Sequence, residues 1–147
     1  MKLNKPSIGF ILLSIATIFT VVGFILYFST FSVFNYQQSK ITIACTIIAL
    51  WSMISLIINS LFANDKPTLF NIFFLINVFA LAFAFSYFLI PCLSPIGIYF
   101  TVNMGDMETY ALGVPRCLAG CAFYVISILL NIVASFFTLT KGGQNNE

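Results

Sequence analysis

The spacing of the charged residues constrains this chain more than any other feature of its sequence. Only ten residues are charged, six basic and four acidic, and they leave uncharged stretches of 34, 24, 39 and 24 residues. These stretches are residues 6–39, 41–64, 67–105 and 117–140. About 20 apolar residues in a helix cross the hydrocarbon core of a bilayer. The spacing therefore predicts an all-α integral membrane protein with four transmembrane helices.

The composition agrees with this interpretation and excludes two other classes of protein. Hydrophobic residues make up 61% of the chain, charged residues 7%, and the mean hydropathy is +1.06. Soluble domains carry about 25% charged residues, and disordered chains are depleted in large apolar side chains. The chain is therefore predicted to be neither a soluble globular protein nor a disordered one.

Polar turns and prolines divide the chain into spans and connections. We expect one membrane domain over residues 1–147, an antiparallel bundle whose spans cover about 8–31, 41–62, 68–90 and 116–140. Residues 91–114 contain Pro91, Pro95, three glycines and an acidic turn, which together favour a structured outer loop or short hairpin over the bundle's outer mouth.

The distribution of basic residues predicts the orientation of the bundle. With the N-terminus inside, the inner side holds four basic residues and the outer side two, Lys40 and Arg116. The positive-inside rule then predicts cytoplasmic N- and C-termini in a plasma or inner membrane. All six tyrosines then fall in the outer half, where they form either an interfacial belt or an external binding surface: Tyr27, Tyr36, Tyr87, Tyr99, Tyr110 and Tyr124.

Several kinds of chemistry have no support in the sequence. The chain has no histidine, and no Lys, Arg, Asp or Glu lies inside the four uncharged stretches. It has no glycine-rich phosphate-binding motif and no basic cluster for nucleic acid. We therefore expect no catalytic site, no cofactor, no metal site and no nucleic-acid partner, and we do not expect an enzyme.

Polar side chains recur at helical spacing within the predicted spans. Ser52 and Asn59 lie seven residues apart, and steps of four separate the three polar residues Ser127, Asn131 and Ser135. Asn77 and Asn131 each lie ten residues from the inner end of their span, so we expect a hydrogen bond between them. We interpret these six residues as interhelical polar contacts, which are common in membrane bundles. The alternative is that they line a polar path for a solute.

The outer side carries two further groups of candidate residues. Cys92 and Cys117 lie at the two feet of the predicted loop, which makes them candidates for a disulfide. The pair Cys117 and Cys121 is one residue wider than the CxxC of redox centres, so a thiol-redox role is a minor alternative. The loop residues predicted to form an outer interaction surface are Tyr99, Asp106, Glu108 and Tyr110.

These features favour a non-enzymatic function within the membrane. The leading hypothesis is an accessory or scaffold subunit of a larger membrane complex, in which transport is one role. The alternatives are an oligomeric channel or facilitator for a small neutral solute and a membrane thiol-redox protein. The expected partners are membrane lipid and either other membrane subunits or further copies of this chain.

Overall fold

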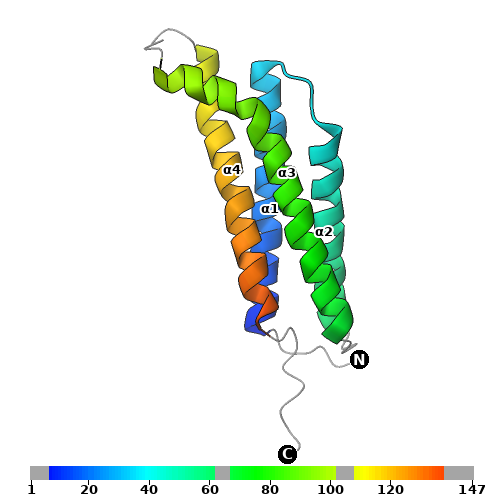
Figure 1. Cartoon of the computed structure of the whole chain (residues 1–147). Coiled ribbons are helices and arrows are strands. Elements are labelled where there is room, and N and C mark those ends of the chain that lie inside the picture. Colours follow the sequence, from blue (N-terminus) through cyan, green and yellow to red (C-terminus); the bar gives the residue numbers. More distant parts are fainter. Residues whose placement is uncertain (1–6, 62–66, 102–107, 138–147) are drawn as a thin grey trace, which may run out of the picture.

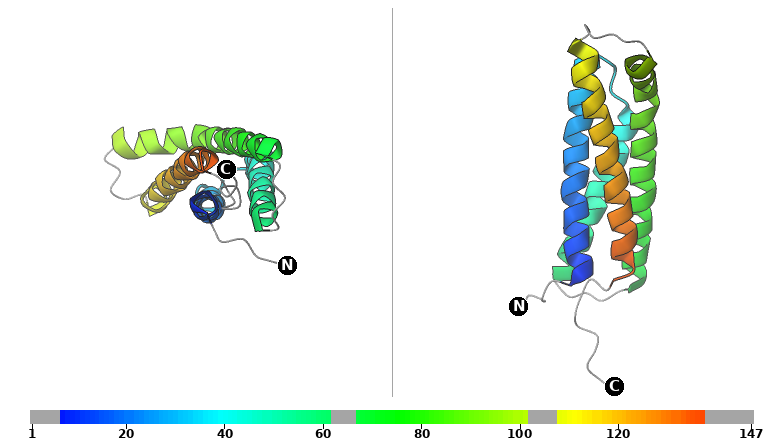
Figure 2. Two further views of the ribbon diagram at one scale, coloured as in Figure 1. Left: turned by 90° about the horizontal axis from the view of Figure 1, so that it is seen from below. Right: turned by 90° about the vertical axis from the view of Figure 1, so that its left-hand side faces the viewer.

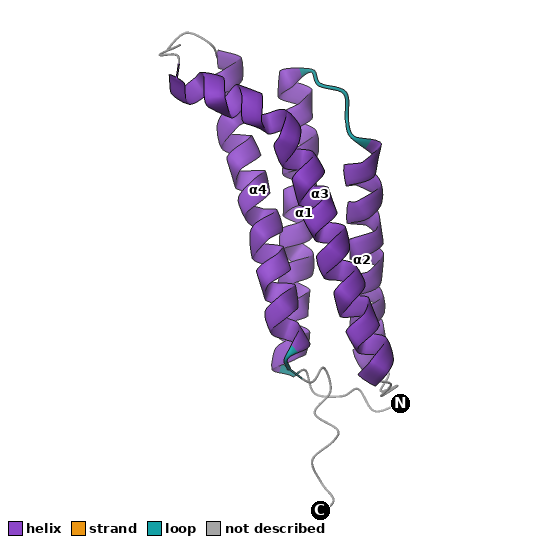
Figure 3. Cartoon of the chain, in the orientation of Figure 1, coloured by secondary structure: helices purple, strands orange, loops and turns teal. Residues whose placement is uncertain are grey.

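The protein is built from four long helices and the short segments that join them (Figures 1 and 3). The computed structural model describes residues 7–61, 67–101 and 108–137. The helices are α1 (Ile8–Phe34), α2 (Lys40–Leu61), α3 (Pro67–Thr101) and α4 (Glu108–Ser135). Each is long and apolar enough to cross a membrane. The prediction of an all-helical chain with four apolar, span-length helices is therefore confirmed.

The helices pack side by side (Figures 1 and 2). The most extensive contacts lie between α1 and α4, followed by those between α2 and α3 and between α3 and α4. The contacts between α1 and α2 are fewer. The first and last helices of the described chain therefore form the closest pair.

Small residues allow α1 and α4 to approach each other. Gly23 on α1 lies against the ring of Tyr124, and Gly120 on α4 lies against Phe88 of α3 and Leu26 of α1. Ala16, seven residues before Gly23, is fully buried on the same helix. Helices in lipid gain stability when small residues let their backbones come close. Glycine at these two positions thus leaves room for the aromatic rings of the neighbouring helices.

Local hydrogen bonds set the two ends of α1. The Ser7 side chain accepts a hydrogen bond from Phe10 N at 3.2 Å, which caps the first turn. At the other end Asn35 adopts a left-handed conformation with φ 52°. Tyr36 N then donates to Phe31 O at 3.1 Å, and the rings of these two residues pack together. This is a Schellman ending, in which Asn replaces the more common Gly.

The prediction of a loop over residues 91–114 is wrong for residues 91–101 and 108–114, and the rest of that range lies outside the described residues. The chain remains helical through Pro91 and Pro95 to Thr101, and α4 already begins at Glu108. A proline inside a helix removes one backbone hydrogen bond and kinks the helix without having to end it. Figure 1 shows the consequence: the last turns of α3 bend away from the bundle axis on the side of α4.

The other predicted bounds shift by smaller amounts. α1 extends to Phe34 rather than ending near residue 31, while α2 begins and ends one residue earlier than expected. α4 ends at Ser135 rather than near residue 140, because residues 136–137 form a turn and a bend. Apolar composition alone did not locate this end, since Phe136 and Phe137 continue the hydrophobic run.

Candidate functional site

Hydroxyl groups join α1 to α4 deep within the bundle. The side chains of Thr20 and Ser127 are fully buried, and their oxygens lie 2.6 Å apart. Both hydroxyls also lie 2.9 Å from the carbonyl oxygen of Ala16. The sulfur of Met53 on α2 lies 3.9 Å from the Thr20 hydroxyl. Ser127, one of the predicted contact residues, therefore connects two helices and faces the interior.

The structure brings the amides of Asn77 and Asn131 together between α3 and α4. Asn131 Nδ2 donates to Ser127 O at 2.9 Å, which orients that amide so that its oxygen faces Asn77. Asn77 Nδ2 then donates to Asn131 Oδ1 at 3.5 Å, a long hydrogen bond. Both side chains are fully buried, and Asn77 Oδ1 has no hydrogen-bond partner among the described residues. The pair thus uses three of its four polar atoms.

The remaining polar candidates divide between the interior and the surface. Ser52 is buried on α2 and donates to Phe73 O on α3 at 3.3 Å, so it makes an interhelical contact. Asn59 and Ser135 are exposed, and the Ser135 hydroxyl bonds Ile132 O of its own helix at 2.6 Å. The sequence spacing put Asn59 on the stripe of Ser52, and Ser135 on the stripe of Ser127, but both side chains are exposed in the structure. These two are not interhelical contacts within the described chain.

Two of the six tyrosines belong to the core rather than to a belt or an outer surface. Tyr27 and Tyr124 are fully buried, and Phe88 packs against both rings, with centroid distances of 5.3 and 6.1 Å. The Tyr124 hydroxyl lies 2.9 Å from that of Thr46 on α2. The Tyr27 hydroxyl accepts a hydrogen bond from Ser39 N at 2.7 Å. Tyr124 therefore joins helices through its ring and its hydroxyl. Tyr27 contacts α3 through its ring and the connection before α2 through its hydroxyl.

Three of the cysteines are buried in the core. Cys92 is on α3, Cys117 and Cys121 are on α4, and all three belong to one cluster of buried residues. The four cysteines of the chain are free thiols in the structure, so the Cys92–Cys117 disulfide stays a prediction. Within the described ranges, no group of three His, Cys, Asp or Glu side chains is arranged to hold a metal ion.

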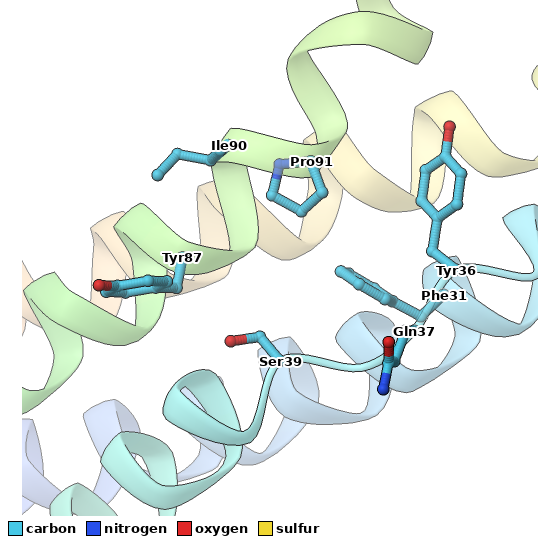
Figure 4. Close-up of a pocket in the computed structure, with 7 residues that line it drawn as sticks. All are labelled: Phe31, Tyr36, Gln37, Ser39, Tyr87, Ile90 and Pro91. Carbon is cyan, nitrogen blue, oxygen red and sulfur yellow. The ribbon is translucent and has the colours of Figure 1, made fainter.

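An open pocket of about 540 Å³ lies between the α3 kink and the connection from α1 to α2. Figure 4 shows the Phe31 ring on one side of this space and Pro91 on the other. Its lining is mostly apolar and aromatic, with polar groups from the connection: Phe31, Tyr36, Gln37, Ser39, Tyr87, Ile90 and Pro91. Sequence reasoning missed this pocket, although three of its residues stand in the polar stretch that separates the first two spans.

The predicted outer interaction residues differ in exposure. Tyr99 and Glu108 are exposed, whereas Tyr110 is half-buried and packs edge-on against Phe34, with ring centroids 5.8 Å apart. Asp106 lies outside the described residues. The nearby cation Arg116 donates from Nη1 to Ser29 Oγ at 3.0 Å, which joins α4 to the end of α1.

The described residues thus contain two sites of interest, the interior layer of polar contacts and the open pocket at the α3 kink. The first holds helices together, and the second has room for a ligand. Comparison with known proteins gives no match: no family model fits the chain, and neither a curated protein nor a solved structure is significantly similar to it.

Proposed function

We propose that this chain is a non-enzymatic accessory or scaffold subunit of a larger membrane complex, an antiparallel four-span bundle with both termini in the cytoplasm. The observation that carries the proposal is the use of its polar side chains. Ser52, Ser127, Asn77 and Asn131 bond from one helix to another inside the chain. Interhelical bonds of this kind stabilise membrane bundles. Residues used in this way are not free to line a continuous polar path.

The outward side of the bundle supports lateral association with other spans. Only about a third of the residues in the apolar stretch of each helix are buried inside the protein, and most of the exposed side chains are large and apolar. Trp51, the single tryptophan of the chain, is 74% exposed near the middle of α2. Tryptophan prefers membrane interfaces to the hydrocarbon centre and is enriched at interaction hot spots. We therefore place the subunit contact on the outward face of α2.

Affinity purification in a mild detergent tests this function. The wild-type chain is expected to retain the same membrane partner in repeated purifications, and Trp51→Ala is expected to retain much less of it. Ile25→Ala, a matched change of an exposed side chain on α1, is the control and should keep the partner. A chain that purifies only as a homo-oligomer and conducts a neutral solute in proteoliposomes would contradict the proposal and support the channel alternative.

A thiol-active membrane protein is the second candidate. It is favoured by the burial of Cys92, Cys117 and Cys121 in one core cluster. This candidate requires a cysteine pair that changes its redox state in the cell. Mass spectrometry of the alkylated protein tests it, and three thiols that remain reduced under every growth condition would exclude it.

A further inference from the structure

The pocket at the α3 kink has an apolar wall and a polar edge. Phe31, Ile90 and Pro91 form apolar parts of the lining, while Gln37 and Ser39 add polar groups from the connection between α1 and α2. The same connection contains the first polar run after the 27-residue helix α1. If α1 crosses the bilayer, this run lies where the chain enters the headgroup region. The pocket then borders both the hydrocarbon and the interface.

Backbone chemistry at the kink frees a carbonyl acceptor in a residue that lines the pocket. Pro91 has no N–H group, so the carbonyl oxygen of Tyr87, four residues earlier, loses its usual donor within the helix. Both residues line the pocket. A carbonyl without a donor is costly in hydrocarbon and is tolerated where it borders a polar group or a cavity. A ligand with a hydroxyl group would supply the missing donor.

The charge beside the pocket is positive. Lys40 follows the lining residue Ser39 directly and is exposed at the start of α2. The sequence from Ser32 to Ile43 contains no acidic residue that would neutralise it. Arg116, the other cation predicted for the outer side, is engaged with Ser29. Lys40 therefore gives the start of α2, next in sequence to the polar edge of the pocket, a positive charge that would attract an anionic group.

We propose that the pocket binds one anionic glycerophospholipid from the surrounding leaflet. An acyl chain packs against Phe31, Ile90 and Pro91, the phosphate faces Lys40, and a headgroup hydroxyl donates to the Tyr87 carbonyl. A bilayer offers this ligand at the level of the pocket at high local concentration. The position of Ser39 is held by Tyr27, whose hydroxyl bonds Ser39 at both N and O, so the polar edge is formed before a lipid binds.

The test measures thermal unfolding and lipid binding of the full chain, purified in detergent, with phosphatidylglycerol or phosphatidylcholine as the added probe. Phosphatidylglycerol is expected to raise the Tm of the wild type more than phosphatidylcholine does. Lys40→Gln should weaken phosphatidylglycerol binding about five-fold, which equals about 1 kcal/mol, the usual contribution of one Lys near an anionic surface. Lys40→Arg keeps the charge and should keep the selectivity.

A second pair of variants tests whether the lipid occupies this pocket. Ile90→Trp adds bulk at the lining and is expected to remove most of the selective Tm increase. Ile76→Trp, an exposed position on the same helix that does not line the pocket, should leave it unchanged. Equal stabilisation of the wild type by the two lipids would overturn the proposal. Selectivity that survives both Lys40→Gln and Ile90→Trp would overturn it as well.

Discussion

Gly120 offers the sharpest test of how the helices are packed. A Cβ added at this position would lie 2.7 Å from Phe88 Cε1, 2.9 Å from its Cζ and 3.3 Å from Leu26 Cβ. Phe88 is fully buried and packs against the rings of Tyr27 and Tyr124, so it has little room to move. Overpacking of this kind costs about 1–3 kcal/mol, whereas Gly→Ala in a helix gains up to about 1 kcal/mol. We expect Gly120→Ala to lower the free energy of unfolding by about 1–2 kcal/mol.

The assay is reversible unfolding in mixed micelles, with Gly97→Ala as the matched control. A Cβ at Gly97 on α3 would meet nothing within 4 Å, so this change should leave stability unchanged or raise it slightly. Combining Gly120→Ala with Phe88→Leu should cost less than the sum of the two changes, because the smaller side chain relieves the clash. A Gly120→Ala protein as stable as the wild type would refute the packing described for α1, α3 and α4.

Three further predictions concern hydrogen bonding, redox state and orientation. Asn77→Leu and Asn131→Leu should each destabilise the protein, and the double change should fall short of additivity by about 0.6 kcal/mol in a detergent unfolding assay; strictly additive losses would mean that the amides do not interact. Cys92 and Cys117 should form a disulfide in an oxidising exterior, seen as a linked peptide by non-reducing mass spectrometry. Alkylation of both thiols without reductant would contradict this prediction. In a cysteine-free background, Gly143→Cys should escape an impermeant thiol reagent in intact cells, and its labelling would place the C-terminus outside.

The number of the apolar helices and the approximate place of each in the chain follow from the sequence alone. A bilayer admits only long apolar segments whose backbone bonds are satisfied internally, so uncharged stretches of 24 residues or more leave few alternatives to helices. The small residues Ala16 and Gly23 also stand out, because a spacing of seven repeats on one helix face. Equal distance from the predicted inner ends of their spans placed Asn77 and Asn131 at one depth. The structure has the two amides in contact, although α4 ends only four residues after Asn131.

Tertiary structure decided which side chains of a stripe face inward and where the helices end. Ser127 and Ser135 share a stripe, yet one bonds Thr20 and the other is exposed, because the contacts of α4 with α1 and α3 occupy only part of its surface. The helix continues through Pro91 and Pro95, which the sequence alone did not show because a proline can either kink a helix or end it. The pocket at this kink joins residues 31–39 to residues 87–91, and no local pattern specifies such a meeting of distant segments.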